Sequence, residues 1–348
     1  MRLAVLALIA ACGSTTTSTG QGRYGGVAAA IGRGEVPKTT SVLVMQHGQV
    51  EYEGYFGGAD AGTLHDTRSA MKTVTALAVG IAIDRGLIKG VGEPALAYLA
   101  DLRPFAHDTK EKAEITIGDL LTTSSALDCD DNDDKSPGNE DNMHPQPGWA
   151  RWGVDLPTRA DYQRDADGRG PWRYCTIHSF LLGQIVQRVA KQPVDAFIAK
   201  QLFEPLGIGA WEFPYSPTHE AMTGGGLRLS TRDLGKLGQL IRQRGMWQGK
   251  QVVSSGWIDE MTKVRRHAFP ELKMDYGYLI WNHAFKMPCG TVNGWYMSGN
   301  GGNQVLVLDE LDAVVVVTRT AYNTHGMHPQ TIKLIQEDIL PSLSTCKH

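Results

Sequence analysis

The apolar pattern at the start of the chain predicts a β-hairpin followed by a long helix. β-Branched, apolar and aromatic residues fill two runs, 40–46 and 49–56, which are separated by a short turn at His47-Gly48. Runs of this kind on both sides of a glycine turn are typical of two antiparallel strands. The apolar run over 74–83 then recurs on successive helical turns, and it predicts a buried helix that a glycine ends.

The middle of the chain carries helical or loop signals and no convincing strand alternation. The best helical patterns lie at 115–121 and at 174–188. Between them, residues 128–170 form an irregular tract rich in Asp, Asn, Pro and Gly. A loop of this length inside a compact protein is usually functional or disordered, and Trp149 and Trp152 favour an ordered one.

Strand-like runs return toward the C-terminal end of the chain. Helices are predicted first, at 231–244 with Ser230 as N-cap and at 255–264. The runs that follow are 276–282, 294–298, 304–308 and 313–318, with a last helix at 329–340. Strands at both ends with helices between them predict one discontinuous sheet domain and one helical lobe. The predicted boundaries are 1–25 for a leader and tether, 26–87 with 221–345 for the α/β sheet domain, and 88–220 for the helical lobe with its long loop.

Composition and charge describe an ordinary globular protein. Of the 348 residues, 42% are hydrophobic and 20% are charged, and the formal net charge is −3. This balance gives no electrostatic reason to expect nucleic acid or an anionic membrane surface as a partner. No internal stretch of the sequence reaches the roughly 20 apolar residues that cross a bilayer.

The first residues resemble an export signal. Met1-Arg2 precedes an apolar run at 3–11, and Cys12 with small residues follows, an order typical of a secretory signal. The segment Ile9-Ala10-Ala11-Cys12 also resembles a bacterial lipobox, in which the cysteine is lipidated. We therefore expect an exported lipoprotein of the cell envelope or periplasm, in contact with a membrane only through the lipid on Cys12. A cleaved signal without lipid, or a wrongly assigned start codon, is the alternative.

One short motif offers a nucleophile. Ser69 and Lys72 are three positions apart at the start of the predicted helix, so the ammonium can reach the hydroxyl and activate it. The backbone N–H of a serine at a helix start also lacks an intrahelical partner and can stabilise an oxyanion. The spacing alone is weak evidence, because S-x-x-K arises by chance about once in a chain of this length. A second copy, Ser344-Thr345-Cys346-Lys347, lies in the last residues, where fraying is the default.

Two further motifs follow in order. Tyr174-Cys175-Thr176 begins the second good helix, and the glycine-rich segment 299–303 lies between two strand-like runs. Glycines at such a place let a ligand approach the strand backbone closely. Together with S-x-x-K, this order resembles the serine β-lactamase and penicillin-binding protein superfamily, whose class A signatures include S-x-x-K and K-T-G. The closer likeness, over about residues 40–323, is to the class C branch and its esterase relatives, including 6-aminohexanoate-dimer hydrolases.

The resemblance implies a fold and a set of roles. The fold would be α/β (α+β) and β-lactamase/transpeptidase-like, with an antiparallel sheet flanked by helices and a helical lobe. The implied catalytic residues are Ser69 as acylated nucleophile, Lys72 as its basic partner and Tyr174 as proton relay to the leaving group. The implied oxyanion and substrate-binding positions are Ser69, Asn303, Thr176, Asn300, Gly301 and Gly302. No metal and no organic cofactor is expected, and the partner is a small-molecule substrate.

Two departures from the family pattern bear on the substrate. Thr176 stands where the family usually has Asn or Ser, and Asn300-Gly301-Gly302 replaces Lys-Thr-Gly. A lysine there would bind a substrate carboxylate as a point charge, and Asn300 cannot. We therefore expect hydrolysis of a small ester or amide through an acyl-Ser69 intermediate. The alternatives are a true β-lactamase or D,D-peptidase acting on cell-wall peptides, and a non-catalytic penicillin-type receptor or scaffold.

Four cysteines remain once Cys12 is set aside, and an oxidising compartment would permit two disulfides. These residues are Cys129, Cys175, Cys289 and Cys346. We favour a pair between Cys129 and Cys175, because both flank segments that the resemblance places near the active site. Four buried free thiols are the alternative.

Three other patterns are interpreted as structural. Tyr296-Met297-Ser298 fits Y-x-S, but it adjoins the third motif on a predicted strand and cannot approach Ser69 from the opposite lobe. The alternating acidic residues from Asp128 to Asp134 lack the glycine and glutamate of an EF-hand loop, so a solvated acidic loop that helps to shape the substrate pocket is favoured. His178 lies one turn beyond Tyr174 and is interpreted as a helix-packing residue.

Overall fold

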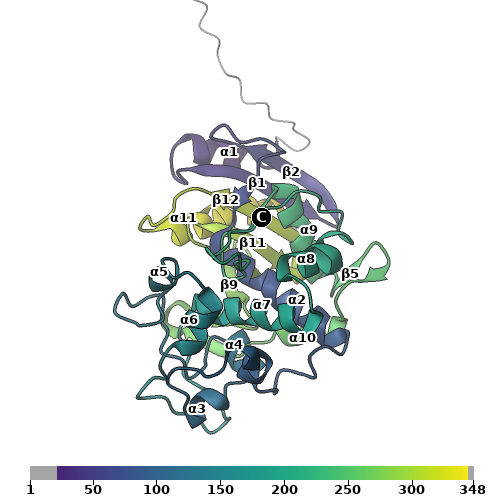
Figure 1. Ribbon diagram of the computed structural model, residues 1–348. Helices are drawn as coiled ribbons and strands as arrows, with labels where there is room; N and C mark the ends of the chain where they lie inside the picture. The colour runs from purple at the N-terminus through teal and green to yellow at the C-terminus, as the bar shows by residue number, and fades with distance from the viewer. Residues whose placement is uncertain (1–21, 344–348) are drawn as a thin grey trace, which may run out of the picture.

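The computed structural model describes residues 22–343, and the chain folds around one large sheet (Figure 1). Cys12, the segment expected to be a leader, Cys346 and the second S-x-x-K copy therefore lie outside the described residues. Eight antiparallel strands form the sheet in the order β2-β1-β12-β11-β10-β9-β8-β7. Their bounds are β1 (Thr39–Gln46), β2 (Gln49–Tyr55), β7 (Arg266–Phe269), β8 (Met274–Tyr276), β9 (Trp281–Met287), β10 (Gly290–Gly299), β11 (Asn303–Leu308) and β12 (Ala313–Arg319).

The two ends of the chain meet in this sheet. The predicted N-terminal hairpin is confirmed as β1 and β2, and β1 pairs with β12 from Thr39↔Arg319 to Gln46↔Ala313. All eight strands come from 39–55 and 266–319. No strand is assigned between residues 88 and 220, which lie wholly within the described part of the chain. The domain boundaries themselves stay a prediction.

The predicted strand at 276–282 is wrong, because the chain breaks there into the end of β8, a turn and the start of β9. At Gly277 a Cβ atom would lie 2.2 Å from the Met261 carbonyl oxygen. The N–H of Leu279 donates to the Leu121 carbonyl, and the Thr73 hydroxyl donates to the Leu279 carbonyl. These tertiary hydrogen bonds, rather than the local apolar pattern, set the path of the chain.

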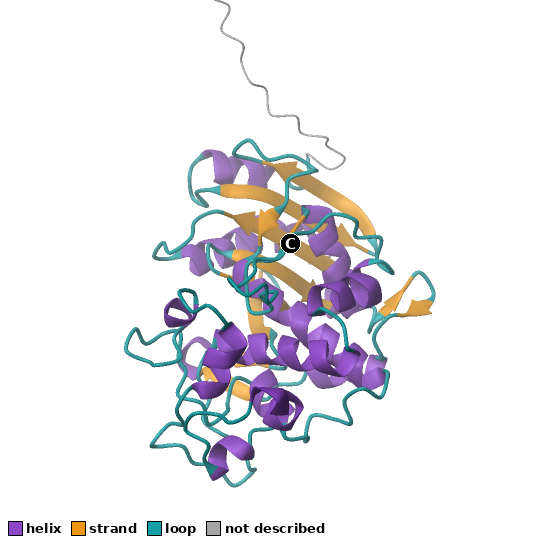
Figure 2. Cartoon of the chain, viewed as in Figure 1, coloured by secondary structure: helices purple, strands orange, loops and turns teal. Residues whose placement is uncertain are grey.

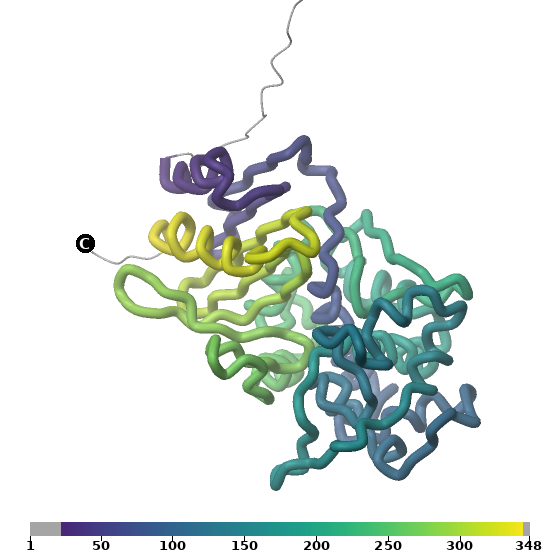
Figure 3. The backbone as a smooth tube through the Cα atoms, turned by 90° about the vertical axis from the view of Figure 1, so that its left-hand side faces the viewer, coloured from purple at the N-terminus to yellow at the C-terminus, as the bar shows by residue number. Residues whose placement is uncertain are grey.

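Helices cover both faces of the sheet (Figure 2). On one face, α1 (Gly25–Gly32) packs beside the C-terminal helical segment, which Figure 3 shows in purple and yellow. That segment comprises α11 (Met327–Leu334), the π-helical turn η6 (Ile335–Ile339) and α12 (Leu340–Leu343). Side chains from these helices form a separate apolar cluster with the strand residues Val42, Val315 and Leu306.

The opposite face carries the larger core and the helical lobe. The helices that pack there are α2 (Met71–Asp84), α4 (Ile117–Leu121), α6 (Trp149–Asp155), α7 (Thr176–Ala190), α8 (Val194–Ile198), α9 (Thr231–Arg242) and α10 (Ser255–Met261). The shorter helical elements are η1 (Arg68–Ala70), η2 (Ala95–Leu102), α3 (Lys110–Ala113), α5 (Glu140–Met143), η3 (Ala199–Phe203), η4 (Pro270–Leu272) and η5 (Asp309–Leu311). Two small two-stranded sheets complete the fold: β3 (His65–Asp66) with β4 (Arg228–Leu229), and β5 (Met246–Trp247) with β6 (Lys250–Gln251).

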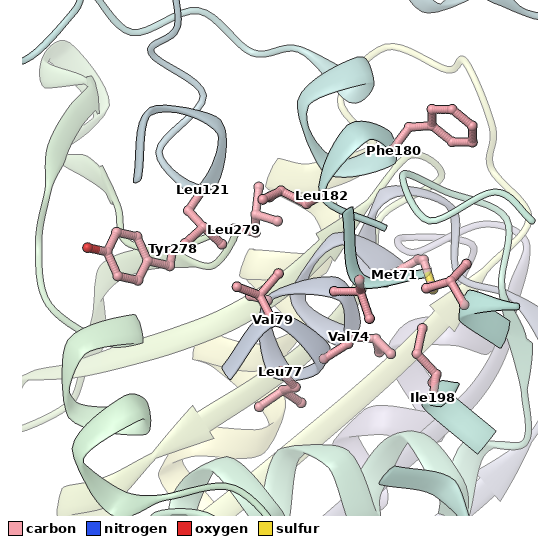
Figure 4. Packing of buried hydrophobic residues seen from close by; sticks show 14 of the residues in the cluster. Met71, Val74, Leu77, Val79, Leu121, Phe180, Leu182, Ile198, Tyr278 and Leu279 are labelled. Atoms are coloured by element: carbon pink, nitrogen blue, oxygen red, sulfur yellow. The ribbon is translucent and has the colours of Figure 1, made fainter. Parts of the chain in front are cut away.

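Helix α2 is buried on nearly all sides, from Met71 to Ala82. Figure 4 shows its apolar side chains among those of α7, α8 and the loop before β9. A helix that is apolar all round is stable only when it is surrounded by protein. Its first turn is therefore fixed by packing on every side, and that turn carries Lys72.

Three predicted helix boundaries are informative. The Ser230 hydroxyl caps α9 by accepting the N–H of Asp233, as predicted. The helix α2 ends at Asp84, with Arg85 as C-cap and Gly86 at a φ of +70°, the left-handed conformation that glycine favours. The predicted helix at 174–188 begins two residues late, at Thr176, because Cys175 is extended. No helix in residues 22–343 is long and apolar enough to cross a membrane.

Candidate active site

The turn that carries Ser69 is held in an unusual backbone conformation. Arg68, directly before it, has a φ of +50°, which is uncommon for a residue other than glycine. The Arg68 N–H donates to Asp66 Oδ1 at 2.9 Å, and its carbonyl accepts the N–H of Gly226 at 3.3 Å. These contacts hold η1 so that Ser69 precedes α2 and faces a cavity. At this place the Ser69 N–H belongs to the first turn, whose N–H groups have no intrahelical partner.

Lys72 joins the first motif to the second. Its Nζ atom donates to Ser69 Oγ at 2.9 Å, to Thr176 Oγ1 at 2.9 Å and to the Gly224 carbonyl at 2.7 Å. The side chain is only 1% exposed. Because an ammonium has three donors, all of its hydrogen-bonding capacity is used. The structure thus brings Ser69, Lys72 and Thr176 together from segments that are more than a hundred residues apart.

Tyr174 contacts Lys72 through its ring. The Nζ atom lies 4.9 Å from the ring centroid, the geometry of a cation–π contact. Trp172 and Trp281 flank the ring, with centroids 6.3 and 5.8 Å from that of Tyr174. Among the described residues, no hydrogen bond joins the Tyr174 hydroxyl to Ser69 or Lys72. The aromatic cluster therefore fixes where the tyrosine lies, and its role as a proton relay stays a prediction.

The third motif is split between two environments. Asn300 lines the same cavity as Ser69. Gly301 and Gly302 face β12 and α11 instead: the Gly301 N–H donates to Met327 Sδ at 3.0 Å, and the Gly302 carbonyl accepts the Thr331 hydroxyl. Asn303 is 2% exposed and pairs with Gly299 in the β10–β11 ladder.

Gly299 is the residue of this segment that touches the nucleophile turn. A Cβ atom on it would lie 2.0 Å from the Thr67 carbonyl oxygen and 3.2 Å from the Ala70 nitrogen. No other residue could occupy this position without moving β10 away from Ser69. The sequence did contain a signal for it, since a glycine inside a strand pattern indicates a close backbone approach.

Two acidic residues of the long loop were missed by the sequence analysis. Asp131 accepts the Thr176 N–H at 2.6 Å through one carboxylate oxygen and the Glu140 N–H at 3.0 Å through the other. The Thr176 hydroxyl donates to Glu140 Oε2 at 2.9 Å. The loop is therefore ordered against the site. Nothing in the sequence separates these two carboxylates from the neighbouring acidic residues that remain in solvent.

The predicted disulfide between Cys129 and Cys175 is confirmed. Cys175 lies between Tyr174 and Thr176, and Cys129 is two residues before Asp131. The Asp131 N–H also donates to the Tyr174 carbonyl at 2.8 Å. One covalent bond and several hydrogen bonds thus fix the acidic loop to the start of α7.

The pKa of Asp131 is raised to about 6, chiefly by burial; the Lys72 charge opposes this rise and the Glu140 charge adds to it. The unfolded aspartate has a pKa of about 3.9, so the folded state disfavours the ionised form. Stability from the protonated form is complete below pH 4 and is lost as pH rises through 6.

Between pH 4 and 7.5 we expect the wild-type protein to lose about 2 kcal/mol of unfolding free energy relative to Asp131→Asn. Urea denaturation of both proteins at the two pH values measures the difference, and a constant difference would contradict the prediction.

The cavity beside Ser69 has a volume of about 630 Å³. Four of its charged residues form two ion pairs, Arg68 with Asp66 at 3.2 Å and Arg228 with Glu212 at 3.8 Å. Glu140 makes no ion pair with any described residue. The remaining side chains of the wall are mostly aromatic or apolar: His144, Trp149, Phe213, Pro214, Tyr215 and Met222.

Of the three patterns interpreted as structural, the acidic run from Asp128 to Asp134 contains Asp131 and so reaches the site, whereas Tyr296 and His178 make no hydrogen bond to Ser69, Lys72 or Thr176 among the described residues. Tyr296 is 1% exposed and belongs to the apolar cluster on the other face of the sheet, where burial raises its pKa. His178 is buried against Ser125, with Nε2 and Oγ 2.7 Å apart, and burial lowers its pKa to about 3. No group of three or more His, Cys, Asp or Glu side chains within residues 22–343 is arranged to hold a metal ion.

Comparisons with known proteins agree with the fold. The Beta-lactamase family model matches residues 20–337. The 6-aminohexanoate-dimer hydrolase of Paenarthrobacter ureafaciens is 24% identical over 229 residues, which cover 64% of this chain and 57% of that protein. The chain therefore matches less than two thirds of that relative's length.

Solved structures with the same fold include two from different kinds of organism. The octameric penicillin-binding protein homologue from Pyrococcus abyssi has a TM-score of 0.68 and 20% identity, over 89% of this chain and 76% of that one. The D-stereospecific amidohydrolase from Streptomyces sp. has a TM-score of 0.67 and 16% identity, over 92% and 99% of the two chains. At these identities the likeness shows the fold.

Proposed function

Because the chain belongs to the Beta-lactamase family, we propose that it is a serine hydrolase that cleaves a small ester or amide through an acyl intermediate on Ser69. The observation that carries the proposal is the 2.9 Å contact between Lys72 Nζ and Ser69 Oγ at the edge of the cavity. In its neutral form the buried amine takes the hydroxyl proton while Oγ attacks the substrate carbonyl.

The oxyanion of this reaction needs two N–H donors that face the cavity. The Ser69 N–H is one. The geometry supports Asn300 rather than Asn303 as the second, because Asn300 lines the cavity while Asn303 pairs with Gly299 in the sheet. The Asn300 N–H makes no hydrogen bond with another described residue, so it is available to a substrate oxygen.

The charges around the cavity favour a substrate without a carboxylate at this position. Asn300 supplies no cation, and Arg68 and Arg228 are already paired with carboxylates. The relatives named as a 6-aminohexanoate-dimer hydrolase and an amidohydrolase support an ester or amide substrate. A β-lactamase or D,D-peptidase activity is the second candidate, and only the family membership supports it.

Labelling with a fluorophosphonate probe tests the proposal. The wild-type protein should be labelled and should hydrolyse p-nitrophenyl butanoate, and Ser69→Ala should do neither. Equal labelling of the two proteins would refute the assignment of Ser69. A nitrocefin assay beside the ester assay separates the two candidates, since faster turnover of nitrocefin would favour the β-lactamase.

We further propose that the protein is exported and lipidated on Cys12. The Cys129–Cys175 disulfide supports an oxidising compartment. Metabolic labelling with a fatty-acid analogue, compared between the wild-type protein and Cys12→Ala, tests whether Cys12 carries a lipid.

A further inference from the structure

A second hydrogen-bonded path leads away from Lys72, and it ends in the cavity. Lys72 Nζ donates to Thr176 Oγ1 at 2.9 Å, and Thr176 Oγ1 donates to Glu140 Oε2 at 2.9 Å. Glu140 lines the cavity together with Ser69. The path therefore connects the base to a carboxylate that a substrate can touch.

The hydroxyl of Thr176 is suited to pass a proton and is not free to bind a substrate. A hydroxyl accepts and donates at the same time, and Thr176 is engaged on both sides. Its side chain is fully buried behind Glu140 and Lys72. This arrangement gives a physical reason for a hydroxyl side chain, rather than Asn, at position 176.

We propose that Glu140 is the catalytic acid that protonates the leaving group, and that it receives the proton from Lys72 through Thr176. The proposal rests on the serine hydrolase function proposed above. In the reactive form Lys72 is neutral and Glu140 is a carboxylate. As Ser69 Oγ forms its bond to the substrate carbonyl carbon, its proton moves to Lys72 Nζ.

The proton then moves along the path without changing the number of protons on Thr176. Lys72 gives one proton to Thr176 Oγ1 as Thr176 gives its own to Glu140 Oε2, which leaves Lys72 neutral and Glu140 protonated. Glu140 donates this proton to the alcohol oxygen or amine nitrogen as the bond to the carbonyl carbon breaks. The products are the acyl-Ser69 ester, a neutral leaving group and the Glu140 carboxylate.

The surrounding contacts fix the geometry of this path. Asp131 holds the backbone N–H groups of both Thr176 and Glu140, at 2.6 and 3.0 Å. The other Glu140 oxygen, Oε1, makes no hydrogen bond with a described residue, so the carboxyl group keeps a site for the substrate. The Tyr174 hydroxyl, the relay expected from the family, has no such connection to Lys72 in the described part of the chain.

The test compares two esters of butanoic acid whose leaving groups differ in their need for protonation. p-Nitrophenolate leaves as an anion, whereas methoxide must be protonated as it leaves. In Glu140→Gln we expect kcat/KM for methyl butanoate to fall about 10²-fold. The kcat/KM for p-nitrophenyl butanoate should fall less than about tenfold, because acylation by this ester needs no acid.

Variants of Thr176 distinguish the loss of the proton path from a change in the shape of the site. Thr176→Val removes the hydroxyl at nearly constant volume and should reproduce the selective loss on methyl butanoate. Thr176→Ser keeps the hydroxyl and should restore most of the activity. Asp141→Asn, which removes a charge from an exposed neighbour of Glu140, should leave the ratio of the two kcat/KM values unchanged.

Two results would overturn the proposal. One is an equal loss of kcat/KM on both esters in Glu140→Gln. The other is a Thr176→Val variant that is as active on methyl butanoate as Thr176→Ser. Failure of the wild-type protein to hydrolyse either ester, together with absence of Ser69 labelling, would instead refute the proposed function on which it rests. Thermal unfolding of each variant shows that the proteins compared are folded.

Discussion

Replacing Lys72 by methionine is expected to lower kcat/KM for p-nitrophenyl butanoate by about 10²–10⁴-fold, the usual contribution of a positioned general base. Methionine fills nearly the same volume, but it cannot accept the Ser69 proton. It also leaves the Gly224 carbonyl and the Thr176 hydroxyl without their donor, at a cost of about 1–3 kcal/mol for each buried group left unsatisfied. The protein should therefore remain folded but be less stable, as steady-state kinetics and urea denaturation would measure.

Lys72→Arg distinguishes a base from a fixed positive charge. Arginine keeps the charge and can donate to the same oxygens, but it cannot be deprotonated in a protein. If the lysine acts as a base, Lys72→Arg should be nearly as inactive as Lys72→Met. Activity within tenfold of the wild-type value would contradict this role and would favour a purely electrostatic one.

The turn that carries Ser69 and Lys72 and the N-terminal hairpin were predictable because their signals are local. The spacing of Ser69 and Lys72 places both on one helical turn, and packing of the whole apolar helix keeps that turn in place. The hairpin 39–55 follows from runs of strand-forming residues on both sides of a glycine. Each of these features depends on residues that are close together in the sequence.

The carboxylates of the site were not predictable, because their roles arise from contacts between distant segments. Asp131 and Glu140 lie in a loop without periodicity, and several acidic residues beside them stay in solvent. What distinguishes the two is the Thr176 backbone and hydroxyl, 45 and 36 positions away in the chain. The favoured pair of Cys129 and Cys175 predicted that this loop lies beside the start of α7, but it did not distinguish Asp131 and Glu140 from their acidic neighbours.

In the third motif, our proposal departs from the family pattern by a few residues. The expected donor, Asn303, is buried in the sheet, whereas Asn300 and Gly299 lie beside Ser69. Only the register, Gly299↔Asn303, shows which backbone faces the nucleophile.

Gly299→Ala is expected to lower kcat/KM by at least about 10²-fold, because the substitution displaces the turn that carries Ser69. The new Cβ would lie 2.0 Å from the Thr67 carbonyl oxygen, which accepts the N–H of Ala70. Restoring ordinary contact requires β10 and η1 to move apart by more than about 1 Å, and a misplacement of about 1 Å costs about 10²-fold in rate. Slower labelling of Ser69 by a fluorophosphonate, measured as a rate constant, would report the same displacement.

Gly256→Ala is the matched control, since it makes the same chemical change where no atom lies within 4 Å of the new Cβ. It lies in α10, where alanine is a better helix former than glycine, so unfolding free energy should be unchanged or slightly higher. If Gly299→Ala is labelled as fast as Gly256→Ala, the edge of β10 is not what positions the nucleophile turn. In that case the burial of α2 would be sufficient to hold Ser69 in place, and the oxyanion donor would have to be sought away from the end of β10.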